Sequence, residues 1–244
     1  MTIIQRCSTA LIALVFQPHC PLCERSASAA LCSACQTQIQ TQCYRDRQLF
    51  WRSPLPVFPW GQYGGALRQS IAALKYESKP GVAQLLGAWL GRAWLMSAEY
   101  AAVKRALSKG ARSIAVVPIP MYAEKRQQRG YDQAMLIAQQ FCRVTRLPLR
   151  QHGLIRKRAT VAQFCLSAPE REANLTDAFR VDRSLSNIHG GVLLVDDIYT
   201  TGATARAAAE ALQRLAIPVL GIVTVAATGA IATSKDSFSA TQEI

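Results

Sequence analysis

The stretch from Val192 to Thr204 restricts the fold of this chain more than any other. Residues 192–195 are all apolar and predict a buried strand, and Asp196 and Asp197 follow where that strand emerges. A loop rich in threonine then leads straight into a helical pattern. A buried strand joined to a helix by a short loop is typical of an α/β fold with a parallel sheet, in which ligands bind beyond the carboxyl ends of the strands.

The loop after the paired aspartates has the chemistry of a phosphate site. Glycine lets the backbone approach a phosphate, and the N–H groups that open a helix donate to phosphate oxygens together with threonine hydroxyls. The residues that we assign to this loop are Thr200, Thr201, Gly202, Ala203 and Thr204. The sequence therefore predicts an anion site at the start of the following helix.

Asp196 and Asp197 would repel that phosphate unless they served another group. Suitable partners for two adjacent carboxylates are sugar hydroxyls or a hydrated Mg²⁺. A sugar phosphate bound with a metal satisfies both halves of the motif. The alternative is a helix start whose acidic residues merely complement the helix dipole, which does not explain the threonines.

The rest of the chain alternates strand and helix patterns, which predicts a doubly wound parallel sheet. The buried strands are expected at 114–117, 191–195 and 219–225, and the helices at 66–76, 80 to about 106, 131–146 and 203–215. A packing helix is expected at 9–16, against a signal segment, and another helix from 167 onwards. Residues 51–63, rich in proline and aromatics, are expected to be a linker or an extended docking segment.

A basic segment follows the strand expected at 114–117. Lys125, Arg126 and Arg129 are placed on a loop beyond that strand, and a second basic run begins at Arg156. Such cations can grip a pyrophosphate or a nucleic-acid backbone, whereas the plain alternative is a solvated loop. The formal net charge of +13 also favours partners that carry phosphate.

The N-terminal region holds two Cys-x-x-Cys pairs, Cys20/Cys23 and Cys32/Cys35. Four thiolates at this spacing can close a tetrahedral Zn²⁺ site, and four protein ligands leave no open position, so the zinc is expected to be structural. Cys43 or His19 could replace one of the four ligands. A dithiol redox role is the alternative. The clustering of the cysteines favours metal ligation in a reducing compartment over a framework of disulfide bonds.

The stretch from Val192 to Thr204 resembles the phosphoribosyl pyrophosphate signature of type I phosphoribosyltransferases. That resemblance implies that Asp196 and Asp197 contact the ribose 2′ and 3′ hydroxyls and that residues 200–204 cradle the 5′-phosphate. In a phosphoribosyl transfer, the aspartates with Arg126 and Arg129 would be the catalytic residues, with Lys125 binding phosphate. Mg²⁺ would accompany the ligand.

The order of motifs along residues 20 to 225 is similar to that of the ComF family. These motifs are the cysteine pairs, Tyr-Gly-Gly-Ala-Leu-Arg with Lys-Tyr, Pro-x-Pro, Arg-Gly-Tyr-Asp-Gln, Arg-x-x-Asn-Leu and the phosphate loop. The resemblance implies a zinc-binding N-terminus, a phosphoribosyltransferase-like domain, and association with DNA uptake in natural competence or use of DNA as a nutrient. Asp132 stands where the family pattern has asparagine, and the arginine on the last strand of many members is missing after Val225.

Three functions follow as hypotheses. The first is a ComF-type protein with a retained ribose 5-phosphate site, with catalysis left open. The second is an active phosphoribosyltransferase in nucleotide salvage, and the third is a module that binds single-stranded DNA without catalysis and hands it to a helicase. For the third, Trp51, Phe58, Trp60 and Tyr63 could stack on bases, although packing under the cysteine module is the expected role.

The expected organisation is a cysteine module at 1–48, a linker and helical segment at 49–110, the phosphoribosyltransferase-like domain at 111–228 and a disordered tail at 229–244. The uncharged run 216–234 is interpreted as a buried strand and tail because it contains proline, glycines and β-branched residues. No membrane insertion and a cytoplasmic location are therefore expected.

Overall fold

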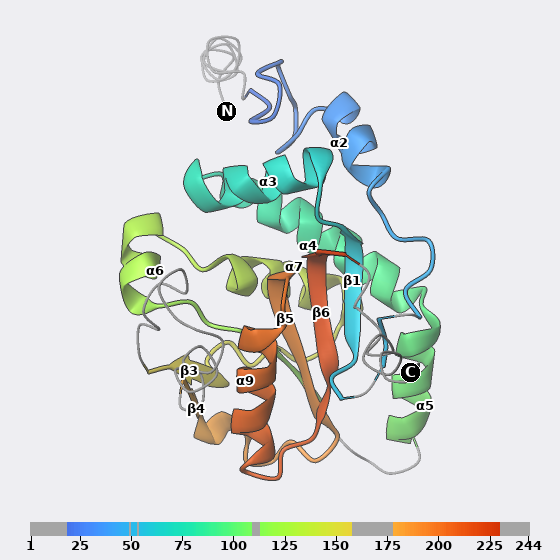
Figure 1. Ribbon diagram of the computed structural model, residues 1–244, viewed down its shortest axis with the longest axis vertical. Helices are drawn as coiled ribbons and strands as arrows, with labels where there is room; N and C mark the ends of the chain where they lie inside the picture. The colour runs from blue at the N-terminus through green and yellow to red at the C-terminus, as the bar shows by residue number, and fades with distance from the viewer. Residues whose placement is uncertain (1–18, 49, 53, 109–112, 158–177, 230–244) are drawn as a thin grey trace, which may run out of the picture.

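The core of the protein is a parallel sheet covered by helices on both faces, as the computed structural model in Figure 1 shows. The structure describes residues 19–48, 50–52, 54–108, 113–157 and 178–229. The strand order in the main sheet is β1-β6-β5-β2, and every pairing is parallel. The strands are β1 (Val57–Gln62), β2 (Ile114–Pro118), β5 (Gly191–Tyr199) and β6 (Val219–Ala227).

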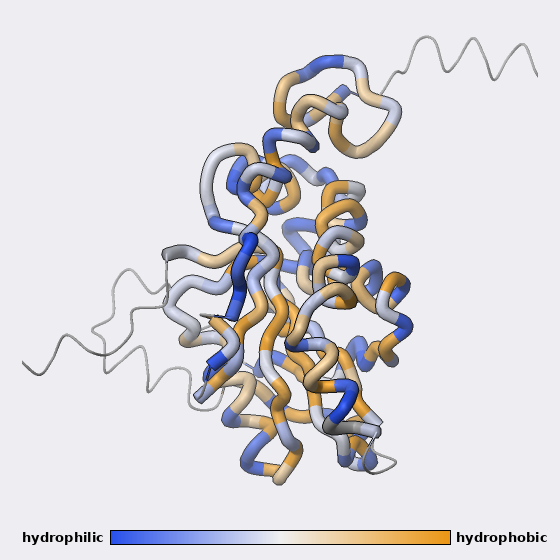
Figure 2. The backbone as a smooth tube through the Cα atoms, turned by 90° about the vertical axis from the view of Figure 1, so that its right-hand side faces the viewer, coloured by the Kyte–Doolittle hydropathy of each residue, from blue (hydrophilic) through white to orange (hydrophobic). Residues whose placement is uncertain are grey.

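Helices pack on the two faces because successive side chains of a strand point in opposite directions. Leu193 and Val195 of β5 join a core with α3, α4 and α7, whereas Val192 and Leu194 join a second core with α9. The helices are α3 (Gly65–Tyr76), α4 (Pro80–Leu95), α5 (Ala98–Ser108), α7 (Gln133–Thr145) and α9 (Ala203–Gln213). In Figure 2 the central strands are mainly hydrophobic, as expected for a sheet covered on both sides. The doubly wound α/β prediction is confirmed.

The segment expected to be a linker or an extended docking segment contributes a strand of the main sheet. Val57–Gln62 forms β1, and it pairs in parallel with β6, for example Pro59 with Thr224. The prolines in this segment argued against a strand, because proline lacks the backbone N–H that donates hydrogen bonds to a neighbouring strand. An edge strand tolerates proline, and β1 lies at the edge of the sheet.

Two further expectations need correction. The basic segment after β2 is a helix, α6 (Ala123–Arg129), and the helical pattern expected to run from 80 to about 106 divides into α4 and α5. A small antiparallel pair, β3 (Leu154–Arg156) with β4 (Phe179–Val181), was not expected. The other elements are α2 (Ser33–Gln40) and the short 3-10 helix η2 (Arg183–Leu185).

The aromatic residues before and within α4 belong to the core. Trp60 is buried and stacks on Trp89 with ring centroids 5.4 Å apart, and Trp94 packs against Trp51 and Phe58. The same core includes residues of the cysteine region, so packing is confirmed for Trp60 and Phe58, and neither ring is open to a base.

Several expectations fall on residues outside the described ranges. These are the helices at 9–16 and from 167 onwards, and the tail from residue 230. The division into domains at residues 48, 110 and 228 stays a prediction. Among the described residues, no helix has both the length and the apolar character that crossing a bilayer requires.

Candidate functional site

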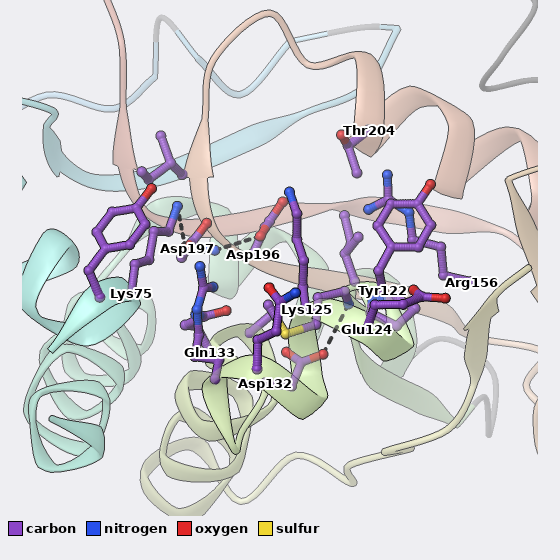
Figure 3. Close-up of a pocket in the computed structure, with 18 of the residues that line it drawn as sticks. Lys75, Tyr122, Glu124, Lys125, Asp132, Gln133, Arg156, Asp196, Asp197 and Thr204 are labelled. Carbon is purple, nitrogen blue, oxygen red and sulfur yellow. Dashed lines mark hydrogen bonds and ion pairs between the residues drawn. The ribbon is translucent and has the colours of Figure 1, made fainter. Parts of the chain in front are cut away.

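A cleft of about 740 Å³ opens beyond the carboxyl ends of β2 and β5, where the fold class predicts a ligand. Its walls come from the end of α3, the turn after β2, α6, the start of α7, β3 and the end of β5. Figure 3 shows Asp196 near its centre. Side chains from segments more than a hundred residues apart therefore face a single space.

The paired aspartates lie near the end of strand β5. This strand extends to Tyr199, four residues beyond its expected end. Asp197 is buried and forms an ion pair with Lys75 of α3. The distance between Lys75 Nζ and Asp197 Oδ2 is 2.7 Å. Asp196 is partly buried, and its Oδ1 accepts a hydrogen bond from the Asp197 backbone N–H at 2.8 Å. The structure thus supplies a cation to a carboxylate pair that the sequence left uncompensated.

This arrangement shifts the pKa values of two groups in the cleft. Burial and then the neighbouring Asp197 carboxylate raise the pKa of Asp196 well above its ordinary value. Burial acts to lower the pKa of Lys75, but the Asp197 and Asp196 carboxylates outweigh burial and leave that pKa raised. Lys75 therefore stays charged, and Asp196 holds its proton to a higher pH than a solvated aspartate.

The phosphate loop lines a second, small pocket of about 60 Å³ beside the same aspartate. Gly202 has φ = 76°, and a Cβ at this position would collide with the Tyr199 side chain. The Arg206 guanidinium donates to the Thr201 carbonyl at 2.8 Å, which fixes the loop against α9. The five predicted loop residues surround this pocket together, and Thr200 and Thr204 also face the larger cleft.

The predicted cations are not equally placed. Lys125 and Arg129 line the cleft, whereas Arg126 is exposed and is absent from the lining of either pocket. Helix α6 explains this difference, since consecutive residues of a helix point about 100° apart. Arg129 also lies over the exposed ring of Tyr76, 5.6 Å from its centroid.

The Arg-Gly-Tyr-Asp-Gln motif joins these walls. Gly130 ends α6 in a left-handed conformation, and the Tyr131 hydroxyl donates to the Leu74 carbonyl at 2.5 Å, which ties α3 to the turn before α7. Asp132 caps α7 by accepting from the Met135 N–H at 3.1 Å. Its other oxygen accepts from Met121 N–H at 3.0 Å.

These two contacts use both oxygens of the aspartate as acceptors, whereas the asparagine of the family pattern has one acceptor oxygen and an NH₂ donor.

Lys75, Tyr122 and Gln133 line the cleft but were not among the predicted site residues, whereas Arg156, which also lines it, opens a basic run that was noted in the sequence. The Arg156 guanidinium lies 4.2 Å from the Tyr122 ring centroid and 5.3 Å from that of Phe179. Lys75 and Gln133 belong to motifs that supported the family resemblance, so the signal was present. Their place in the cleft depends on how α3 and α7 pack.

The four cysteines of the two Cys-x-x-Cys pairs gather into one cluster. The sulfur atoms of Cys20, Cys23, Cys32 and Cys35 all lie within 4.8 Å of one another. Ligands of a tetrahedral zinc site with Zn–S bonds of about 2.3 Å would lie about 3.8 Å apart. Four thiols at this spacing can hold a metal ion, and such soft ligands suit zinc.

Cys43 and His19, the alternative ligands, lie apart from this cluster within the described part of the chain. The sulfur of Cys43 accepts a hydrogen bond from Arg47 at 3.0 Å, and its backbone bridges to Gly61 of β1. His19 is exposed and its backbone pairs with Ser26. Cys43 therefore joins the N-terminal region to the sheet.

Comparison with known proteins gives relatives along most of the chain, although no family model matches it. The chain is 28% identical to competence protein F of Haemophilus influenzae over 220 residues, which cover 82% of this chain and 91% of the relative. It is 28% identical to the DNA utilization protein YhgH of Escherichia coli O6:H1 over 202 residues, covering 80% and 84%.

A third relative is competence protein ComFC of Bacillus subtilis, which is 27% identical over 195 residues, or 79% of this chain and 70% of the relative. The three alignments each span about four-fifths of the chain. Over most of its length, the chain is therefore similar to proteins named for competence and for DNA utilization, in agreement with its resemblance to the ComF family.

Proposed function

We propose that the cleft binds a ribose 5-phosphate ligand of the phosphoribosyl pyrophosphate type, with Mg²⁺, in a protein that serves DNA uptake or the use of DNA. The observation that carries the proposal is the placement of Asp196 and Asp197 next to the loop 200–204 in one cleft. The names of the relatives, competence and DNA utilization proteins, support the cellular role. A cytoplasmic location is part of the same proposal.

Each part of such a ligand has a complementary group. The loop offers backbone N–H groups and hydroxyls to a 5′-phosphate at the start of α9. Asp196 and Asp197 can accept hydrogen bonds from ribose hydroxyls, and Mg²⁺ would neutralise charge between carboxylate and pyrophosphate oxygens. Lys125 and Arg129 lie on the α6 wall, where a pyrophosphate would gain charge-assisted hydrogen bonds.

Calorimetric titration of phosphoribosyl pyrophosphate with Mg²⁺ tests this proposal. We expect saturable binding to the wild type, and affinity lowered at least tenfold in both Asp197→Asn and Thr204→Val. Lys104→Ala is a matched control because Lys104 is an exposed cation on α5, which does not line the cleft. Absence of binding to a folded wild type would overturn the proposal.

Single-stranded DNA is a second candidate ligand, favoured by the net charge of +13 and by cations beside the cleft. The affinity for an oligonucleotide should then fall steeply with added salt, because each phosphate contact releases a counterion. Affinity that ignores salt would count against this role. Delivery of the strand to a helicase is the form of this role that we propose.

We further propose that Cys20, Cys23, Cys32 and Cys35 hold one structural zinc ion. Elemental analysis of the purified protein should give one zinc per chain. A preparation without zinc that keeps the same thermal stability would contradict this assignment.

A further inference from the structure

The cleft has two chemically different ends, and only one is accounted for by a ribose phosphate. In Figure 3, Thr204, Tyr122 and Arg156 lie to one side of Asp196, toward the phosphate loop. Lys75 and Gln133 lie to the other side, around Asp197. We refer to this second side, built by α3 and the start of α7, as the α3 end.

Gln133 places an unpaired amide at the α3 end. It is the first residue of α7, it lines the cleft, and its side chain is only 4% exposed. Its buried Nε2 has no hydrogen-bond partner within the protein. Buried polar groups without partners are rare in native proteins because each loses its hydrogen bonds to water. An acceptor atom on a ligand would restore this bond.

Tyr76 offers a flat surface at the same end. It directly follows Lys75 on α3, it lines the cleft, and 79% of it is exposed. The other large apolar side chains with high exposure in the described residues are Met96 and Leu215, and neither lines the cleft. An exposed aromatic ring at a cleft can stack on a planar heterocycle, as it does on bases in nucleic-acid-binding proteins.

The polar groups of the α3 end are mainly donors. Nε2 of Gln133 donates, and the ammonium of Lys75 is also a donor without acceptor atoms. Asp197, the nearby acceptor, is already paired with Lys75. A ligand that fits here is planar and presents acceptors such as a carbonyl oxygen.

From these observations we infer that the α3 end is a subsite for a keto-nucleobase, which stacks on Tyr76 and accepts a hydrogen bond from Gln133. This inference rests on the proposed function in that the base would lie beside a bound ribose phosphate. The cleft volume of about 740 Å³ lies within the range of pockets that hold ligands of this combined size.

The test compares hypoxanthine, which presents a carbonyl oxygen beside a ring N–H, with adenine, which presents an amino group beside a bare ring nitrogen at the same two positions. Each base is titrated calorimetrically into the full-length protein, with and without ribose 5-phosphate and Mg²⁺. Ribose 5-phosphate carries no pyrophosphate and so cannot transfer its sugar. We expect hypoxanthine to bind about tenfold more tightly than adenine, since adenine presents a donor where the site needs an acceptor.

Three variants assign the contacts. Tyr76→Ala should weaken hypoxanthine binding about tenfold, while Tyr76→Phe keeps the ring and should bind as the wild type does. Gln133→Leu should weaken hypoxanthine about fivefold and reduce the preference over adenine. Because this leucine removes an unpaired buried amide, the thermal midpoint should stay equal or rise, which separates a lost ligand contact from a damaged fold.

The outcomes for the base and the sugar phosphate are separable. If ribose 5-phosphate and phosphoribosyl pyrophosphate bind but neither base does, the subsite is wrong and the proposed function stands. The subsite is also wrong if hypoxanthine binding is unchanged in Tyr76→Ala and Gln133→Leu. Base binding that depends on these residues, without any sugar-phosphate binding, would support the subsite and overturn the proposed function. Competition by a deoxyinosine oligonucleotide would identify a DNA strand as the source of the base.

Discussion

The cysteine cluster and the cleft both gather groups that repel one another when ionised, but they deal with this charge differently. In the cleft, Lys75 supplies a cation from within the chain, 2.7 Å from Asp197. The four cysteine sulfurs lie within 4.8 Å of one another and have the spacing of a site that takes its cation from solution. One region therefore contains a counter-charge of its own, whereas the other has a geometry that can hold a metal ion.

Removal of the metal is expected to have the largest effect. Chelation, or Cys35→Ser, should unfold the region around α2, because binding of structural zinc contributes about 10–16 kcal/mol in isolated zinc-finger peptides. Hydrogen exchange should show lost protection at residues 19–43 while strands β2, β5 and β6 stay protected. Unchanged exchange after verified zinc removal would show that packing alone holds the cluster.

Loss of the internal cation should have the next largest effect. Lys75→Met leaves Asp197 buried and unpaired, and we expect a loss of about 2 kcal/mol in unfolding free energy, somewhat less than for fully buried pairs. Urea denaturation measures this loss, and Asp197→Asn added to Lys75→Met should recover most of it. If the double variant is as unstable as Lys75→Met alone, the lost stability comes from the packing of the lysine side chain and not from the unpaired Asp197.

A smaller effect of opposite sign is expected at Asp196. Its pKa is raised in the folded protein, while an unfolded aspartate titrates near about 3.9. The folded state therefore holds this proton more tightly, so the contribution of Asp196 to stability is greatest below about pH 3.9 and is lost as the pH rises through the folded pKa. Asp196→Asn should melt at a higher temperature than wild type at pH 8, by about 2–4 °C per kcal/mol gained.

This difference should disappear towards pH 4, while the variant binds phosphoribosyl pyrophosphate with Mg²⁺ more weakly at every pH. If Asp196→Asn is less stable than the wild type at pH 8, favourable interactions of the charged Asp196 carboxylate outweigh the cost of burying it. The melting curves at several pH values supply both measurements.

The smallest effect separates two cations of α6. Arg129 lines the cleft and Arg126 does not, so Arg129→Ala should weaken phosphoribosyl pyrophosphate about fivefold, as expected for one solvent-accessible charged hydrogen bond. Arg126→Ala should change the affinity less than twofold. Equal losses, measured by titration at one salt concentration, would indicate a general electrostatic contribution.

The parts of the cleft that were predictable from sequence are those built by one continuous segment. Strand β5, Asp196, Asp197 and the loop 200–204 follow one another, so local spacing was sufficient to identify the anion site. The Lys75–Asp197 pair joins residues 122 positions apart, and nothing in the local pattern of α3 indicates which face meets β5. Prediction failed where tertiary packing decides.

The same reasoning explains the errors in the predicted secondary structure. Buried strands β2, β5 and β6 are apolar runs bounded by turn residues, and their positions were predicted closely. Strand β1 contains Pro59 and was taken for a linker. Proline is tolerated in an edge strand, but the sequence does not show that β1 lies at the edge of the sheet. Helix α6 was taken for a loop because it is short, and none of its residues is buried.

Helix α3 has a role that reaches beyond its own wall of the cleft. On one side it packs against α2 of the cysteine region, and on the other it carries Lys75 to Asp197. Cys20, Cys35 and Leu67 of α3 share one hydrophobic core. The cysteines line neither pocket, yet their oxidation during storage should therefore appear as a loss of ligand binding that fresh reductant and zinc restore together.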